Sequence, residues 1–175
     1  MGYKHLNYLT RCQKENNLPV IILPMHSDDI EAVAKIHAQA FPRQRDSSGW
    51  ISCNFAAYPR IMLFVARDEN DKVIGYIQWI QKSEFRLESV VELEQIAVNK
   101  LHQGCGIGAL LISKSLVHIK DYLSDSHSTL KAILVSTRTD NEAKALYEKA
   151  LKAKEIAVIK DLYSHDEVIL MSREV

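Results

Sequence analysis

The sequence has few cysteines and no long apolar run, and both absences narrow the class of protein. Its three cysteines are widely spaced and form no C-x-x-C pair, which argues against a disulfide framework or a zinc site. The seven histidines show no ligand spacing either. The longest apolar run, Ile61–Ala66, is far shorter than the roughly 20 residues that cross a bilayer. We therefore expect no metal and no membrane-spanning segment.

The chain also lacks an excess of charge of one sign. Its 22 Lys and Arg residues balance 22 Asp and Glu residues, so no overall field attracts it to nucleic acid or to an anionic membrane. The N-terminal residues lack the apolar core of a signal peptide. These features predict a cytoplasmic protein without nucleic-acid or membrane partners, either a monomer or a homodimer. The length predicts a single domain over residues 1–175, with residues 1–18 as a flexible or additional segment.

The most informative segment is residues 93–111, L-E-Q-I-A-V-N-K-L-H-Q-G-C-G-I-G-A-L-L. It reads as an apolar strand, a polar turn, a glycine-rich loop and the start of a helix. The glycines at 104, 106 and 108 permit positive φ angles and a close approach of the backbone. A helix N-terminus adds unpaired N–H groups and a dipole that favours an anion. The segment therefore predicts a phosphate-binding loop.

Two ligand classes use such a loop. From Gly104, the letters G-C-G-I-G-A match the dinucleotide fingerprint G-x-G-x-x-A. That fingerprint begins at the end of an early strand and has an acidic residue about 20 positions later, whereas here a polar spacer follows the strand and Thr129 and Lys131 stand at that distance. From Gln103, the pattern is Q-x-x-G-x-G, which resembles the acetyl-CoA pyrophosphate loop of the GNAT N-acetyltransferase superfamily. The second interpretation is favoured, and the dinucleotide interpretation stays open.

Hydrophobic periodicity predicts the other elements. Apolar and β-branched runs predict strands at residues 19–24, 61–67, 73–81, 88–98, 129–137, 155–162 and 167–172. Helical spacing predicts helices at 27–41, 107–123 and 143–151, and residues 43–58 read as a loop with a short helix. The order β α α β β β α β α β β predicts an α/β, single-domain fold with a central mixed sheet of about seven strands and helices on both faces.

This order resembles GNAT proteins over nearly the whole chain, and the segment D-N-E-A-K-A-L-Y-E-K at 140–149 strengthens the resemblance. The resemblance implies acetyl transfer from acetyl-CoA, as co-substrate, to a primary amine by direct attack. It implies that Ile96 and Val98 offer main-chain groups to pantetheine. The full set of implied CoA contacts is Ile96, Ala97, Val98, Gln103, Gly104, Cys105, Gly106, Ile107, Gly108, Ala109, Asp140, Ala143 and Tyr147.

Acetyl transfer to an amine of pKa ~10.4 needs a proton acceptor at neutral pH. Glu92 and Glu94 are two residues apart on a predicted strand, so they share a face. Both align with positions where branches of the family have a catalytic Glu, and Glu94 lies nearer the expected thioester. Tyr147, by the same resemblance, protonates the departing thiolate. The structural alternatives are a solvated acidic face for the glutamates and a core position for the tyrosine.

The sequence departs from the family pattern at two points and leaves the acceptor open. Asp140 stands where the family usually has an Asn that contacts pantetheine, and A-L-K-A-K-E replaces the usual Gly-Phe after the Tyr147 helix. The resemblance assigns acceptor choice to Phe41–Tyr58 and Leu162–Val168. A-F-P followed by Trp50 resembles the ribosomal-protein alanine N-acetyltransferase branch, which implies a protein N-terminus as acceptor. A small amine (polyamine or aminoglycoside) and a non-catalytic acyl-CoA-binding module are the alternatives.

Overall fold

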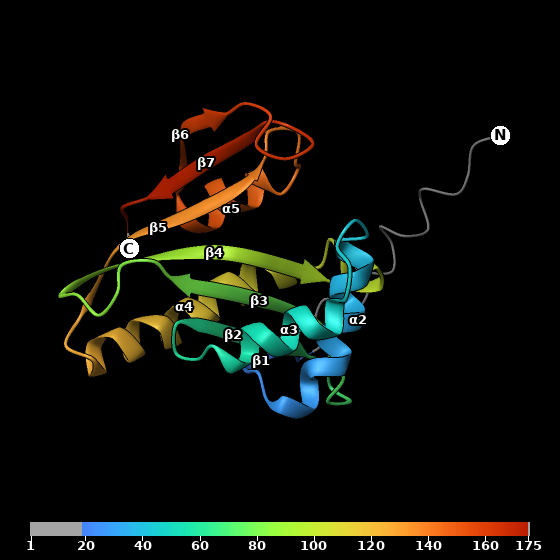
Figure 1. Cartoon of the computed structure of the whole chain (residues 1–175). Coiled ribbons are helices and arrows are strands. Elements are labelled where there is room, and N and C mark those ends of the chain that lie inside the picture. Colours follow the sequence, from blue (N-terminus) through green and yellow to red (C-terminus); the bar gives the residue numbers. More distant parts are fainter. Residues whose placement is uncertain (1–18, 175) are drawn as a thin grey trace.

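The structure is a computed structural model in which residues 19–174 are described (Figure 1). The additional segment expected at residues 1–18 lies outside the described residues. The strands are β1 (Ile21–Pro24), β2 (Ile61–Arg67), β3 (Val73–Gln81), β4 (Glu88–Val98), β5 (Thr129–Arg138), β6 (Lys154–Ile159) and β7 (Glu167–Ser172). The α-helices are α2 (Ile30–Ala40), α3 (Ser47–Ala56), α4 (Ile107–Asp125) and α5 (Lys144–Leu151), with 3₁₀ turns η1 (Ser27–Asp29) and η2 (Lys100–His102). The predicted order of strands and helices is confirmed.

All seven strands belong to one mixed sheet in the order β1-β2-β3-β4-β5-β7-β6. Every neighbouring pair is antiparallel except β4 and β5, which are parallel. The glycine loop and α4 form the crossover between these two strands, as a parallel connection requires. The sheet and its crossover therefore bring the predicted phosphate loop to the end of the only parallel pair among the described strands.

Helices cover both faces of the sheet, with α2 and α3 on one face and α4 on the other (Figure 1). The core under α4 and α5 is built around Trp79, Leu93 and Ile119, and the core under α2 and α3 around Val65 and Tyr76. Because successive side chains of a strand point to opposite faces, the apolar strands β2 and β3 supply both cores. The strand β4 contributes side chains to both cores.

The strand β4 changes register at a single residue. Gln78 lies opposite Gln95, and the next residue of β3, Trp79, lies opposite Leu93. Glu94 is therefore the additional residue of a β-bulge. Leu93 and Ile96 both belong to the core under α4, although they are three residues apart. The bulge thus keeps the apolar pattern of β4 on its two faces and sets Glu94 outside it.

Candidate functional site

The parallel strands β4 and β5 separate midway along their length (Figure 1). Their pairing ends at Leu93 opposite Val135. Beyond that point β4 pairs only with β3, up to Val98, and β5 pairs only with β7, up to Arg138. One edge of β4 is consequently open from Glu94 onward. We call this opening the splay.

The open edge presents main-chain groups of β4. The N–H of Asn99 donates to the carbonyl of Ile74 on the β3 side, at 2.8 Å. Main-chain groups alternate between the two sides of an antiparallel strand, so those of Ile96 and Val98 point toward the splay. The Val98 carbonyl accepts a hydrogen bond from Gln103 Nε2 at 2.9 Å. The side chain of Ala97 is buried in the core under α2 and α3. The splay therefore offers an extended ligand an edge with which to pair.

The glycine loop lies directly after this edge and ends at the N-terminus of α4. Gly104 and Gly106 have φ angles of 77° and 79°, and Gly106 is the N-cap of α4. A Cβ added at either glycine would meet no protein atom within 4 Å. The first helical turn, which holds Ile107 and Ala109, has N–H groups without partners inside the helix. The loop thus combines open space with N–H donors and a favourable dipole, an arrangement that fits a phosphate.

Gly108 has a different role from the two loop glycines. A Cβ at this position would stand 3.1 Å from Leu146 Cδ2 of α5. Gly108 therefore permits close packing of α4 against α5. This contact holds the helix that carries Tyr147 next to the helix that begins at the glycine loop.

Tyr147 combines a buried ring with an accessible hydroxyl. The residue is 5% exposed and belongs to the core under α4. Its hydroxyl has no hydrogen-bond partner among residues 19–174. The side-chain atoms of these residues that are fully buried without a partner are Gln78 Nε2, Gln81 Oε1 and Ser172 Oγ, and the Tyr147 hydroxyl is not one of them. The hydroxyl therefore reaches solvent. Burial raises the pKa of Tyr147 to about 12, so the phenol keeps its proton at neutral pH and can donate it.

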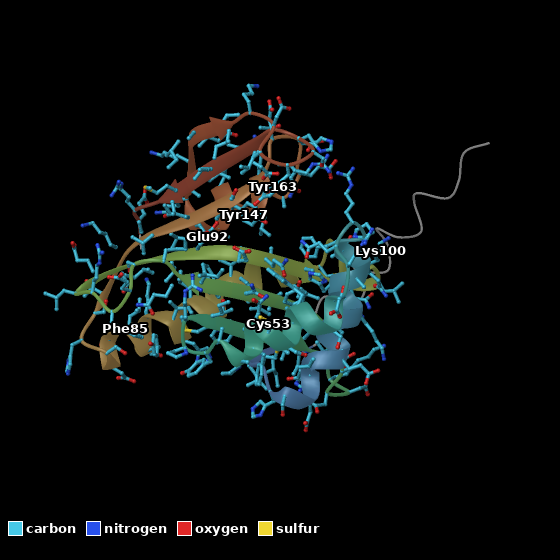
Figure 2. All side chains as sticks on the ribbon, in the orientation of Figure 1. Cys53, Phe85, Glu92, Lys100, Tyr147 and Tyr163 are labelled. Atoms are coloured by element: carbon cyan, nitrogen blue, oxygen red, sulfur yellow. The ribbon has the colours of Figure 1, made fainter. Side chains whose placement is uncertain are left out.

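The two glutamates of β4 have different electrostatic environments. Glu92, labelled with Tyr147 in Figure 2, forms an ion pair with Lys82 at 3.0 Å and its side chain is 14% exposed. Glu94 is partly buried and forms no ion pair within residues 19–174. Burial raises the pKa of Glu94, the charge of Glu92 raises it further, and Lys82 opposes the rise. Glu94 is therefore a stronger base than an ordinary carboxylate.

A group of buried polar side chains lies between α3 and the bulge, and sequence reasoning missed it. Gln95 Oε1 accepts hydrogen bonds from Trp50 Nε1 at 3.3 Å and from the Tyr76 hydroxyl at 3.1 Å. Asn54 Nδ2 donates to Gln78 Oε1 at 3.2 Å. The signal in the sequence is a polar amide in each of two strands at positions that face a core.

The start of α5 places Asp140 and Asn141 in different environments. The Asp140 carboxylate is exposed and accepts a hydrogen bond from Arg138 Nε at 2.9 Å, which lowers its pKa. The neighbouring Asn141 organises the start of the helix instead. Its Oδ1 accepts from the Ala143 N–H at 2.9 Å, and its Nδ2 donates to Thr137 Oγ1 at 2.7 Å. Asn141 is thus a further residue that sequence reasoning missed.

The two segments assigned to acceptor choice touch each other. Arg43, between α2 and α3, donates from Nη1 to Ser164 Oγ, between β6 and β7, at 2.6 Å. Tyr163, beside Ser164, is exposed (Figure 2). Segments 121 residues apart in the sequence are therefore in contact.

The sequence predicts neither a metal site nor a membrane-spanning segment. Within residues 19–174, no group of three or more His, Cys, Asp or Glu side chains could hold a metal ion. No helix of the described part of the chain is long and apolar enough to cross a membrane.

Solved structures of N-acetyltransferases share this fold. Ard1 from Thermoplasma volcanium is 19% identical, with a TM-score of 0.69 over 87% of this chain and 95% of its own. NAA60 from Arabidopsis thaliana, solved with acetyl-CoA, is 17% identical, with a TM-score of 0.70 over 87% and 97%. A spermidine N-acetyltransferase SpeG chimera from Vibrio cholerae and hSSAT is 16% identical, with a TM-score of 0.70 over 88% and 95%. No curated protein sequence matches the chain.

The fold is thus the one these solved structures have, and the sequence identifies the family. The family model of the acetyltransferase (GNAT) domain matches residues 59–150, more than half of the chain. The protein belongs to the GNAT acetyltransferase family.

Proposed function

We propose that the protein transfers the acetyl group of acetyl-CoA to the α-amino group of a peptide or protein N-terminus. The observation that carries this proposal is the meeting of three features at one point: the open edge of β4, the glycine loop that follows it, and Glu94 in the bulge where the edge begins. An acyl-CoA ligand needs the first two, and an amine acceptor needs the third.

The described residues fit acetyl-CoA. Main-chain groups of Ile96 and Val98 would pair with the pantetheine amides, and the N–H groups from Gly104 to Ala109 would hold the pyrophosphate. Acetyl-CoA supplies the acyl group as a thioester. Asp140, paired with Arg138, could only accept a hydrogen bond from the ligand.

The reaction requires one proton acceptor and one proton donor. The neutral amine attacks the thioester carbon, and its proton passes through water to the carboxylate of Glu94. The tetrahedral intermediate then breaks its C–S bond, and the thiolate takes the phenolic proton of Tyr147. The products are the N-acetylated acceptor and free CoA, and exchange with solvent restores both side chains. The raised pKa of Glu94 suits its role as proton acceptor. The raised pKa of Tyr147 keeps its phenol protonated at neutral pH, so the proton is present for the second step.

The local charge favours a peptide over a polyamine. A polyamine carries several positive charges, and a site for it needs several unpaired carboxylates. Glu92 already pairs with Lys82 at 3.0 Å, which leaves Glu94 as the unpaired carboxylate of the two. A structural neighbour, the NatC complex, was solved with a Gag peptide and CoA, which supports a peptide acceptor. The spermidine N-acetyltransferase neighbour makes the polyamine the comparison to test.

The first test is a calorimetric titration with acetyl-CoA, with NAD as the paired control. We expect micromolar binding of acetyl-CoA and no binding of NAD. A second step incubates the protein and acetyl-CoA with peptides that have free or blocked N-termini and with spermidine, and mass spectrometry detects the product. Acetylation of free N-termini supports the proposal. Binding of acetyl-CoA without transfer to any amine would instead favour a CoA-binding module.

A further inference from the structure

We infer that Gln95 selects acceptors that carry a carbonyl group beside the reacting amine. This inference rests on the proposed function, because it names the chemical class of acceptor for the same site. It depends on the orientation of one buried amide, on the free donors at one end of that amide, and on its position next to Glu94.

The hydrogen bonds of Gln95 fix which way its amide points. An indole N–H can only donate, so the atom 3.3 Å from Trp50 Nε1 must be the amide oxygen. The Tyr76 hydroxyl donates to the same oxygen at 3.1 Å. Two donors from two different elements, α3 and β3, therefore hold the oxygen, and the NH₂ group occupies the other end.

The NH₂ group of Gln95 is available to a ligand. Gln95 is 6% exposed, and its Nε2 has no hydrogen-bond partner among the described residues. Nε2 of the neighbouring Gln78 is fully buried without a partner, and Nε2 of Gln95 is not. The Gln95 donors thus keep access to the surface from an otherwise buried side chain. Because the amide is already immobilised, a ligand that accepts from it loses little additional side-chain entropy.

The position of Gln95 indicates what it would contact. It directly follows Glu94, the bulge residue that takes the proton of the amine in the proposed reaction. At a peptide N-terminus, the first carbonyl oxygen lies close to the amine and accepts hydrogen bonds. In a polyamine, methylenes and further ammonium groups surround the amine, and none of them accepts. Trp50, 39% exposed and fixed by Gln95, supplies an aromatic surface beside the donors.

The test compares two acceptors in the variant Gln95→Glu. The new carboxylate can still accept from Trp50 and Tyr76, but it has no N–H donors. The acceptors are an alanine-initiated peptide and an alkylamine of similar size without the carbonyl. We expect kcat/KM for the peptide to fall at least about tenfold more than kcat/KM for the alkylamine, with unchanged affinity for acetyl-CoA. The added charge near Glu94 affects both acceptors equally, so the ratio reports the lost donor.

Two further variants serve as controls for this experiment. Gln95→Met removes the donors without adding charge and should change the ratio in the same direction. Gln81→Met alters another buried glutamine of β3, whose Nε2 donates to the Glu84 carbonyl at 2.7 Å, and should lower thermal stability without changing the ratio. An equal loss with both acceptors in Gln95→Glu and Gln95→Met would overturn the inference and leave the proposed function intact. Absence of turnover by the unaltered protein with either acceptor would contradict the proposed function, and the inference with it.

Discussion

The two faces of the sheet differ most where β4 leaves β5. On the α4 face, apolar side chains surround Tyr147, and the polar groups offered to a ligand are mainly main-chain groups of β4 and the glycine loop. On the α3 face, the polar groups are side chains: the amides of Asn54, Gln78 and Gln95, the last of which directly follows Glu94 in the bulge. One face is therefore suited to a ligand recognised by backbone geometry, and the other to a ligand recognised by particular side chains.

The largest expected effect concerns the bulge that precedes Gln95. Glu94→Gln removes the proposed proton acceptor and should lower kcat/KM by about 100-fold or more, with acetyl-CoA affinity unchanged in a calorimetric titration. Glu92→Gln is the matched control, because its partner Lys82 already pairs with it.

The pH profile of the control sharpens this contrast. The charge of Glu92 raises the pKa of Glu94, so its removal should lower that pKa. Glu94 would then be ionised at lower pH, and the acid limb of kcat/KM should move to lower pH. An acid limb that stays in place in Glu92→Gln, together with full activity of Glu94→Gln, would show that neither carboxylate is the base.

A smaller loss is expected on the α4 face. Tyr147→Phe should lower turnover at least about tenfold and leave acetyl-CoA affinity intact, because it removes a proton donor while preserving the ring in the core. Tyr122→Phe is the control, since Tyr122 also packs against this core but lies in α4, toward its C-terminus. Unchanged turnover in Tyr147→Phe would reduce Tyr147 to a core residue.

The smallest effects distinguish Gly106, in the glycine loop, from Gly108, which packs against α5. Gly106→Ala keeps all protein contacts but imposes a left-handed Ala and a Cβ in the open space over the loop. We expect about fivefold weaker acetyl-CoA binding, from a cost of roughly 1 kcal/mol. Gly108→Ala should instead lower thermal stability by roughly 1–3 kcal/mol, because its Cβ would crowd Leu146. Calorimetric titration and thermal unfolding of both variants measure the contrast, and identical profiles would remove it.

The α4 face was the more predictable of the two from the sequence. A loop that offers main-chain groups to a ligand needs glycines at short, regular spacing, and the glycines that follow Gln103 have this spacing. The strand order was predictable for a similar reason, because periodicity of 2 and 3.6 residues is a local property. Gly108 shows the limit even here, since its contact with Leu146 depends on how α5 packs.

The α3 face could not be predicted because its contacts join distant parts of the chain. Trp50 and Gln95 are 45 residues apart, and Asn54 and Gln78 are 24 apart. No period in the sequence relates such residues. The bulge does leave a trace in the sequence, because the apolar alternation of β4 changes phase between Leu93 and Ile96. That trace does not say which of the two intervening residues is the additional one. The role of Asn141 at the start of α5 was not predicted either, because it depends on the contact of its side chain with Thr137 at the end of β5.

The bulge in β4 has a consequence for how this strand can vary. When Glu94 is set aside, residues 93, 95, 96, 97 and 98 alternate strictly between the two cores, since Gln95 lies opposite Gln78 and Leu93 opposite Trp79. The proposed proton acceptor therefore occupies the additional position of the strand and takes the place of no packing residue. A substitution at position 94 therefore removes no side chain from either core, so the chemistry of the strand and the stability of the domain can change independently.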